Sequence, residues 1–143
     1  MRPILFGLAL ALAMMLLPAA SAHENQPQIK VHHQSGIDFI YGDADPLERK
    51  AIKRLAERYQ VQLSFARVGS PGPLTGVKVT LVDYKGDKAV EVVCDGPIFF
   101  ANPPAGRWTI EGELNGEKVS RTVDVNGRFY VTFDFKFTGQ TTN

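Results

Sequence analysis

The sequence predicts a mainly β protein, an antiparallel β-sandwich of about seven strands preceded by one amphipathic helix. Apolar residues recur at helical spacing over residues 46–59 and then at every second position after Gln60, which separates a helix from strands. Turn signals such as Asn115-Gly116 and Asn126-Gly127 punctuate the β segments, as is typical of sandwiches and barrels joined by hairpins. The chain of 143 residues is long enough for one domain with its own apolar core.

The first 22 residues have the three parts of an export signal. Arg2 supplies the positive start, residues 4–17 are apolar apart from one Gly, and Ala20-Ser21-Ala22 offers small residues for cleavage. The apolar run is shorter than the ~20 residues that a membrane-spanning helix needs. We therefore expect a signal peptide over residues 1–22, cleaved near Ala22, rather than a retained anchor. The mature chain would be periplasmic or secreted and would have no transmembrane segment.

The rest of the sequence divides into three segments. Residues 23–42 are expected to be a lead-in segment, whose polar part at residues 23–34 is loose or forms a short edge strand around residues 29–31. Residues 43–137 predict a single domain that holds the helix and the sandwich, and residues 138–143 predict a disordered tail. The sequence has no internal repeat.

The predicted helix has a start signal and an apolar stripe. Asp45 can cap it, Pro46 suits its first turn, and Glu48 stands three residues after the cap, as in a capping box. The stripe consists of Leu47, Ala51, Ile52, Leu55, Ala56 and Tyr59. We expect this helix to run from about residue 46 to about residue 59 and to lie on an apolar surface.

Seven segments after the helix have the composition and alternation of strands. They lie at residues 61–65, 77–83, 89–94, 98–101, 108–114, 119–125 and 129–137. The last is the clearest, because Phe129, Val131, Phe133, Phe135 and Phe137 occupy alternate positions. Gly- and Pro-rich stretches at residues 69–73, 95–97 and 102–106 predict loops between them.

The composition excludes several classes of function. Lys and Arg number 16 and Asp and Glu 15, so a chain cleaved after Ala22, which loses Arg2, lacks the basic excess of a nucleic-acid binder. Cys94 is the single cysteine, so no intramolecular disulfide framework can form. All three histidines precede the predicted sandwich, so a Ser-His-Asp or Cys-His catalytic group has no base rooted in the core.

Three short stretches carry a family resemblance. They are Leu74-Thr75-Gly76-Val77-Lys78-Val79-Thr80-Leu81, then Asp83-Tyr84-Lys85-Gly86, and Pro104-Ala105-Gly106-Arg107-Trp108-Thr109-Ile110. They look like the opening strand, the Asp-x-x-Gly turn and the Pro-x-Gly-x-Tyr-x-Val segment of carboxypeptidase regulatory-like domains, with Trp108 in the aromatic place. The resemblance implies a transthyretin-like (prealbumin-like), or more broadly immunoglobulin-like, β-sandwich. These motifs report fold rather than chemistry.

A closer likeness covers nearly the whole mature chain. Residues 59–66, Val77-Lys78-Val79, Asp95-Gly96-Pro97 and residues 104–108 resemble small exported proteobacterial proteins of unknown function. Those proteins often carry Gly-Gly-x-Gly before the helix, where this chain has Ile40-Tyr41-Gly42-Asp43-Ala44. The likeness implies architecture and compartment and no activity.

A histidine at the N-terminus of the mature chain suggests a copper-binding site. Cleavage after Ala22 would make His23 the first residue, whose amine and ring can chelate copper if the folded domain supplies further ligands. His32 and His33 could add to such a site, but adjacent histidines point apart in a strand. The alternative is that all three are solvated residues of the lead-in.

The helix carries a row of basic side chains. Lys50, Arg54 and Arg58 follow one another at i, i+4, which is unfavourable by a few tenths of a kcal/mol for each like-charged pair. An anionic partner, such as lipid headgroups or a polyanionic envelope polymer, would relieve this repulsion. A solvated helix face is the alternative.

Aromatic residues near predicted loops suggest a contact surface. They are Tyr84, Phe99, Phe100 and Trp108. Phe99 and Phe100 should face opposite ways on a strand, so at most one is needed for the core, whereas Trp108 alternates with Ile110 as a core residue would. We expect the contact surface within residues 95–106, and we expect Cys94 to be buried and inert rather than paired between chains.

These observations favour a non-enzymatic, exported binding or accessory module without a cofactor. Its partner would be an unknown protein or an envelope glycan, not nucleic acid. Two other hypotheses remain open. One is a periplasmic copper-binding protein that uses His23, and the other is a structural component whose exposed β-edges pair within an envelope assembly.

Overall fold

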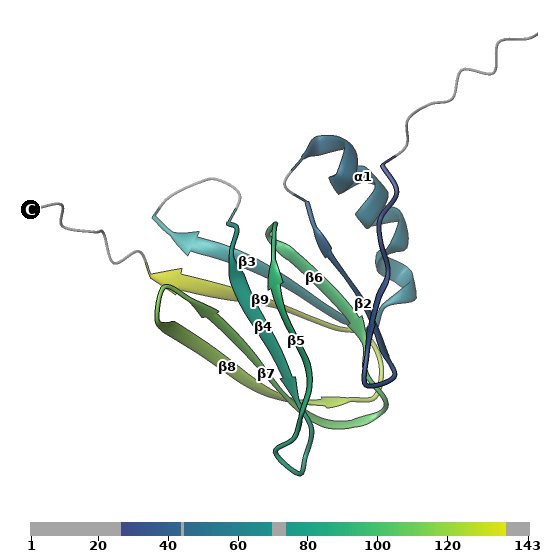
Figure 1. Cartoon of the computed structure of the whole chain (residues 1–143), viewed down its shortest axis with the longest axis vertical. Coiled ribbons are helices and arrows are strands. Elements are labelled where there is room, and N and C mark those ends of the chain that lie inside the picture. The colour runs from purple at the N-terminus through teal and green to yellow at the C-terminus, as the bar shows by residue number, and fades with distance from the viewer. Residues whose placement is uncertain (1–26, 44, 70–73, 137–143) are drawn as a thin grey trace, which may run out of the picture.

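The computed structural model describes residues 27–43, 45–69 and 74–136, which form two facing β-sheets with one helix outside them (Figure 1). The larger sheet has the strand order β1-β2-β6-β3-β9, and the smaller has the order β5-β4-β7-β8. The elements are β1(His32–Gln34), β2(Ile37–Gly42), α1(Pro46–Leu55), η1(Ala56–Arg58), β3(Val61–Val68), β4(Val77–Val82), β5(Lys88–Cys94), β6(Ile98–Asn102), β7(Gly106–Leu114), β8(Glu117–Val125) and β9(Phe129–Lys136). The predicted fold class, a mainly β sandwich with one helix, is confirmed.

The described part of the chain has nine strands rather than about seven, and the two additional strands lie in the predicted lead-in. β1 and β2 form a hairpin, and β2 pairs with β6 inside the larger sheet. Residues 32–42 are therefore part of the sandwich, and α1 lies between β2 and β3 rather than before all strands. Ile37 and Phe39 enter the main core while Ile40 packs under the helix, so β2 has buried apolar residues on both faces although Asp38 is exposed. That double burial removes the clean alternation by which a strand is recognised.

One strand pair departs from the predicted antiparallel pattern. β3 and β9 run parallel along their whole length, from Val61 opposite Phe129 to Val68 opposite Lys136. The other described pairs are antiparallel. Sequence-adjacent strands such as β7 and β8 meet through a hairpin, whereas β3 and β9 meet only after the chain has passed through the other sheet. A parallel pair needs such a long crossover.

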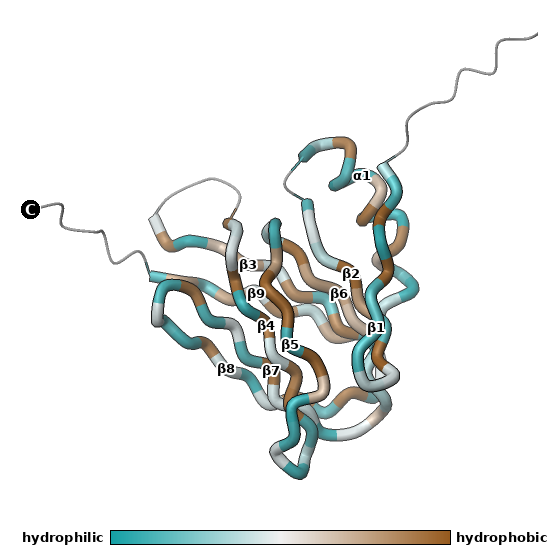
Figure 2. Tube along the Cα trace, viewed as in Figure 1, coloured by the Kyte–Doolittle hydropathy of each residue, from teal (hydrophilic) through white to brown (hydrophobic). Residues whose placement is uncertain are grey.

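The core lies between the two sheets. Hydrophobic and hydrophilic residues alternate along the strands in Figure 2, as expected for sheets with one buried face. Phe133 and Phe135 of β9 are fully buried, and Gly112 of β7 lies against them. A Cβ atom at Gly112 would lie 2.8 Å from Cδ2 of Phe133, so the glycine makes room for the rings.

The helix is shorter than predicted and covers only part of the larger sheet. The side chain of Asp45 caps it as expected, because Oδ1 accepts a hydrogen bond of 2.7 Å from the backbone N–H of Leu47. α1 ends at Leu55 and continues as the 3₁₀ turn η1. Ile52 packs with Ile40 and other residues in a second, smaller core outside the sandwich. Leu47, which is 63% exposed, lies outside the buried stripe.

Two glycines bring backbone segments into close contact beside the helix. A Cβ atom at Gly96 would lie 2.2 Å from the carbonyl oxygen of Gly42, so the Asp95-Gly96-Pro97 turn packs directly on the end of β2. The turn is also tied to β3, because the N–H of Phe65 donates to the carbonyl of Pro97 at 2.8 Å. Gly96 thus permits the close approach of the two backbones, whereas Gly42 leaves room for the side chains of Glu48 and Ile52 in the helix.

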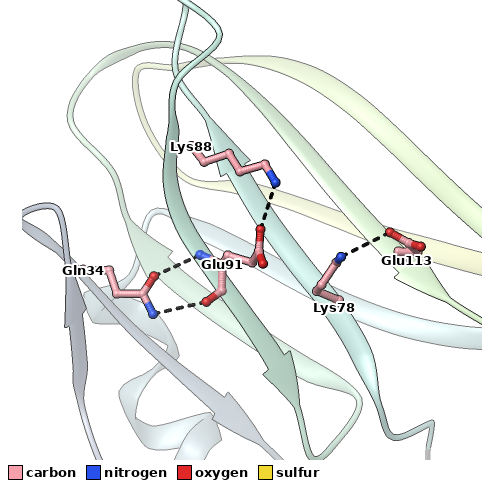
Figure 3. Close-up of polar contacts among 5 residues, drawn as sticks. All are labelled: Gln34, Lys78, Lys88, Glu91 and Glu113. Carbon is pink, nitrogen blue, oxygen red and sulfur yellow. Dashed lines mark hydrogen bonds and ion pairs between the residues drawn. The ribbon is translucent and has the colours of Figure 1, made fainter.

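Side-chain hydrogen bonds join the edges of the two sheets along both seams of the sandwich. On one seam, the amide of Gln34 in β1 pairs with the backbone of Glu91 in β5 (Figure 3). On the other, Oε1 of Glu117 in β8 accepts a hydrogen bond of 3.0 Å from the N–H of Lys136 in β9. Addition of a foreign strand at β5 would have to break the Gln34–Glu91 pair. In the structural-assembly hypothesis, exposed strand edges pair with other proteins. These contacts reduce the length of strand edge that is open for such pairing.

Candidate functional site

A hollow of about 570 Å³ lies where three segments meet at one end of the sandwich. The first runs from η1 to the residue before β3 (residues 57–60), the second is the end of β6 with the loop that leads to β7 (residues 102–105), and the third is the turn before β9 (residues 127–128). The loop segment belongs to the predicted contact surface at residues 95–106. The hollow therefore joins part of that surface to the basic row, through Arg58.

Asn102 fixes two walls of the hollow to each other. Its Oδ1 accepts a hydrogen bond of 2.8 Å from the N–H of Gln60, and its Nδ2 donates to the carbonyl of Arg58 at 2.7 Å. The third wall is attached by the N–H of Phe129, which donates to the carbonyl of Gln60 at 2.6 Å. The shape of the hollow is thus set by the Asn102 side chain and by one main-chain hydrogen bond.

Trp108 holds the loop of the hollow in place. Its Nε1 donates to the carbonyl of Pro104 at 2.9 Å, and its ring is only 8% exposed. Pro103 is buried, and two consecutive prolines restrict the backbone of the loop. Trp108 is therefore a core residue and a tether for the loop, and it offers no stacking surface.

Two arginines give the hollow its charge. Arg58 comes from η1 and Arg128 from the turn before β9. Nη2 of Arg128 donates to the carbonyl of Glu57 at 3.3 Å, and neither guanidinium forms an ion pair with a carboxylate of the described residues. Glu57 is the one acidic residue along the described lining. The hollow can therefore accept an anionic group.

The rest of the predicted basic row lies on α1. Lys50 and Arg54 are exposed, and neither forms an ion pair within the described ranges. Arg49 differs, because its Nε lies 2.7 Å from Oδ1 of the buried Asp43. Arg58 falls in the 3₁₀ turn, where the tighter winding breaks the i, i+4 row that the sequence predicts. It lines the hollow instead.

Three of the four predicted aromatic contact residues are buried. Phe99 and Trp108 lie in the main core, and Phe100 lies under the helix. The expectation that the core needs at most one of Phe99 and Phe100 is wrong, because the helix supplies a second core on the outer face of β6. Tyr84 is 75% exposed in the turn between β4 and β5, with Nζ of Lys85 5.5 Å from its ring centroid. It does not line the hollow.

The histidines of β1 have separate surroundings. His32 stacks on Phe39 and Tyr41, with ring centroids 5.4 and 4.8 Å away, and burial lowers its pKa. Nδ1 of His33 bonds to Oδ1 of Asp38 at 2.5 Å. Across the described residues, no group of three or more His, Cys, Asp or Glu side chains is placed to hold a metal ion. His23 lies outside those residues, so the copper hypothesis stays a prediction.

Cys94 is fully buried at the end of β5, as expected. Burial raises the pKa of its thiol well above the usual range, and the neighbouring charge of Asp95 raises it further. The thiolate is the reactive form of cysteine. Cys94 is therefore a small apolar residue of the core.

Sequence patterns did not indicate that Arg128 and Asn102 line a hollow. Arg128 directly follows the Asn126-Gly127 turn, but only the fold shows that this turn lies beside η1. Tyr130 occupies an outward position of β9, where alternation alone indicates a solvated residue.

Comparison of this chain with models of protein families, with curated proteins and with solved structures found no match. No helix in the described ranges is long and apolar enough to cross a membrane.

Proposed function

We propose that this chain is an exported, non-enzymatic β-sandwich module that binds an anionic group of an envelope polymer in the hollow at residues 57–60, 102–105 and 127–128. The observation that carries the proposal is the placement of Arg58 and Arg128 in one hollow, without a carboxylate of the described residues paired to either. A planar guanidinium presents several N–H donors in a geometry that matches carboxylate and phosphate oxygens.

Two features support a binding role rather than catalysis. The titratable side chains along the described lining are arginines, Glu57 and Tyr59. Burial raises the pKa of Tyr59, so its hydroxyl stays protonated at neutral pH and is a poor base. Glu57 has no histidine beside it in the lining, so no relay of the Ser-His-Asp kind is available there. The likeness to carboxypeptidase regulatory-like domains agrees with an accessory module.

The basic residues of the helix favour a polymer, rather than a single small ion, as the ligand. Lys50, Lys53 and Arg54 are exposed on α1, and the helix leads through η1 to Arg58 in the hollow. A chain with regularly spaced anionic groups can contact the hollow and the helix at the same time, and contacts that share one ligand strengthen each other. Export through the predicted signal over residues 1–22 would place the module among such polymers.

Binding of inorganic polyphosphate and of polygalacturonate by the purified chain tests the proposal. We expect both to bind in low salt, and we expect Arg58→Gln and Arg128→Gln each to weaken binding about tenfold, as loss of a charge-assisted hydrogen bond should. Arg121→Gln is the matched control, because Arg121 is exposed on β8 outside the hollow, and it should bind like the parent chain.

Vesicles of phosphatidylglycerol form the comparison arm. Binding to vesicles without binding to either polymer would replace the envelope polymer with a membrane surface as the partner. Equal losses in Arg121→Gln and Arg128→Gln would show that attraction is spread over the whole surface, which contradicts a site in the hollow.

A further inference from the structure

A group of hydroxyls lies on the outer face of β3 and β9, at Ser64, Tyr130 and Thr132. Oγ of Ser64 lies 3.0 Å from the hydroxyl of Tyr130 and 2.9 Å from Oγ1 of Thr132. Tyr130 is 66% exposed, whereas Ser64 and Thr132 are partly buried beside it. Because Ser64 holds the Tyr130 hydroxyl, the direction of the aromatic ring is fixed before any ligand arrives.

The helix covers only the part of this sheet face that β2 and β6 form. The part formed by β3 and β9 is open. α1 and η1 pack on outward residues of β2 and β6, among them Ile40 and Phe100. β9 is the edge strand at the opposite side of the sheet order. Figure 1 shows the helix beside β2 and β6, with β9 away from it.

Tyr130 is connected to the hollow through one side chain. Gln62 is its neighbour in the β3–β9 register. Nε2 of Gln62 donates to the carbonyl of Ala56 at 2.8 Å and to that of Tyr59, a lining residue, at 3.4 Å. Arg128 precedes Tyr130 by two residues. Tyr130 thus lies opposite Gln62, which contacts the lining residue Tyr59, and two residues along the chain from Arg128.

We propose that the anionic polymer is an acidic glycan, and that one uronic acid unit spans the hollow and the Tyr130 face. This inference rests on the proposed function and adds the chemical class of the ligand. The carboxylate would bind Arg58 and Arg128, and the apolar C–H face of the sugar ring would pack on Tyr130. The hydroxyls of Ser64 and Thr132 both donate and accept, as sugar hydroxyls require. A phosphate polymer would use the arginines but has no ring for Tyr130.

The test compares two probes on the purified chain: oligogalacturonate and inorganic polyphosphate. Tyr130→Ala should weaken oligogalacturonate binding about fivefold to tenfold and leave polyphosphate binding unchanged, because only the sugar contacts the ring. Tyr130→Phe keeps the ring and should bind oligogalacturonate within about threefold of the parent chain. Tyr84→Ala removes another exposed tyrosine elsewhere and should not change the binding of either anionic probe. Unfolding midpoints confirm that the variants are folded.

The outcomes separate this inference from the proposed function. If oligogalacturonate and polyphosphate both bind but Tyr130→Ala affects neither or both equally, the glycan inference is wrong and the anion site stands. If Tyr130→Phe loses as much as Tyr130→Ala, the ring is not the contact and the inference is also wrong. If neither anionic probe binds the parent chain, the proposed function itself is wrong.

Discussion

The side-chain amide of Gln34 forms both hydrogen bonds with the backbone of Glu91. Nε2 donates to the Glu91 carbonyl at 3.2 Å, and Oε1 accepts from the Glu91 N–H at 2.9 Å (Figure 3). The amide thus takes the place of one residue of a neighbouring strand at the edge of β5. The carboxylate of Glu91 points elsewhere, to Nζ of Lys88 at 3.1 Å, and the hydrogen bond from Lys88 lowers its pKa.

Gln34→Ala should destabilise the protein by about 1 kcal/mol. Two hydrogen bonds are lost, but water can reach the exposed backbone groups of Glu91 and replace part of their value. Urea unfolding followed by Trp108 fluorescence measures the change. Gln28→Ala, at an exposed position outside the strands, is the control and should leave the unfolding midpoint unchanged. If Gln34→Ala left the unfolding midpoint unchanged, the Gln34–Glu91 pair would not stabilise the contact between the two sheets.

Gly96→Ala should destabilise the protein by about 1–3 kcal/mol, because its Cβ would meet the Gly42 carbonyl and force two backbones apart. Gly127→Ala is the matched control. A Cβ there meets nothing within 4 Å, and the expected change is within about 0.5 kcal/mol. Thermal or urea unfolding of both variants checks the difference. Equal stabilities of the two variants would contradict the close contact.

Stability should fall as pH drops below the ordinary histidine pKa, through His32. Burial against Phe39 and Tyr41 lowers the pKa of His32 from 6.5, Lys30 and His33 lower it further, and Asp95 opposes them. The unfolded chain then binds more protons, so this contribution is complete above pH 6.5 and is lost as pH falls through the folded pKa.

The difference in unfolding midpoint between the parent chain and His32→Phe isolates this effect. The variant keeps the other titrating groups, and it should lose less stability than the parent between about pH 7.5 and about pH 5.5. Parallel curves for the two proteins would show that protonation of His32 does not destabilise the fold.

The thiol of Cys94 should react about 100-fold more slowly with Ellman's reagent in the native protein than in denaturant. Burial raises its pKa and blocks access, so labelling requires local opening of β5. Absorbance of the released thiolate follows the reaction. Rapid native labelling, or a disulfide-linked dimer on a non-reducing gel, would support pairing between chains instead.

Local patterns predict most strands of this protein and none of its long-range pairings. Val61, Leu63 and Phe65 alternate with more exposed residues and enter the core as expected. The Asn115-Gly116 hairpin forms, with both residues at positive φ as a tight turn of this kind requires. Alternation does not predict β2, because Ile40 is apolar on the face that should be polar. Ile40 packs against the helix, which begins several residues later in the chain.

The candidate site depends on contacts that no local pattern contains. Arg58 could be proposed from charge alone, because like charges on a helix call for an explanation. Arg128 lines the hollow, and Tyr130 can be proposed as a sugar contact, only because β9 lies beside β3, and a sequence dominated by hairpins gives no reason to expect that parallel pair. Phe100 is predicted as a contact residue because the element that buries it, the helix, is a separate part of the chain whose position the sequence does not reveal.

The parallel pairing of β3 with β9 sets the order in which this chain can mature. Until residue 136 has been synthesised, β3 lacks the neighbour that completes its sheet, and Phe133 and Phe135 are missing from the interior. Assembly that waits for such distant segments is slow. We propose that this protein is exported, and slow folding is then useful. A polypeptide that has not yet folded can pass through a narrow translocation pore.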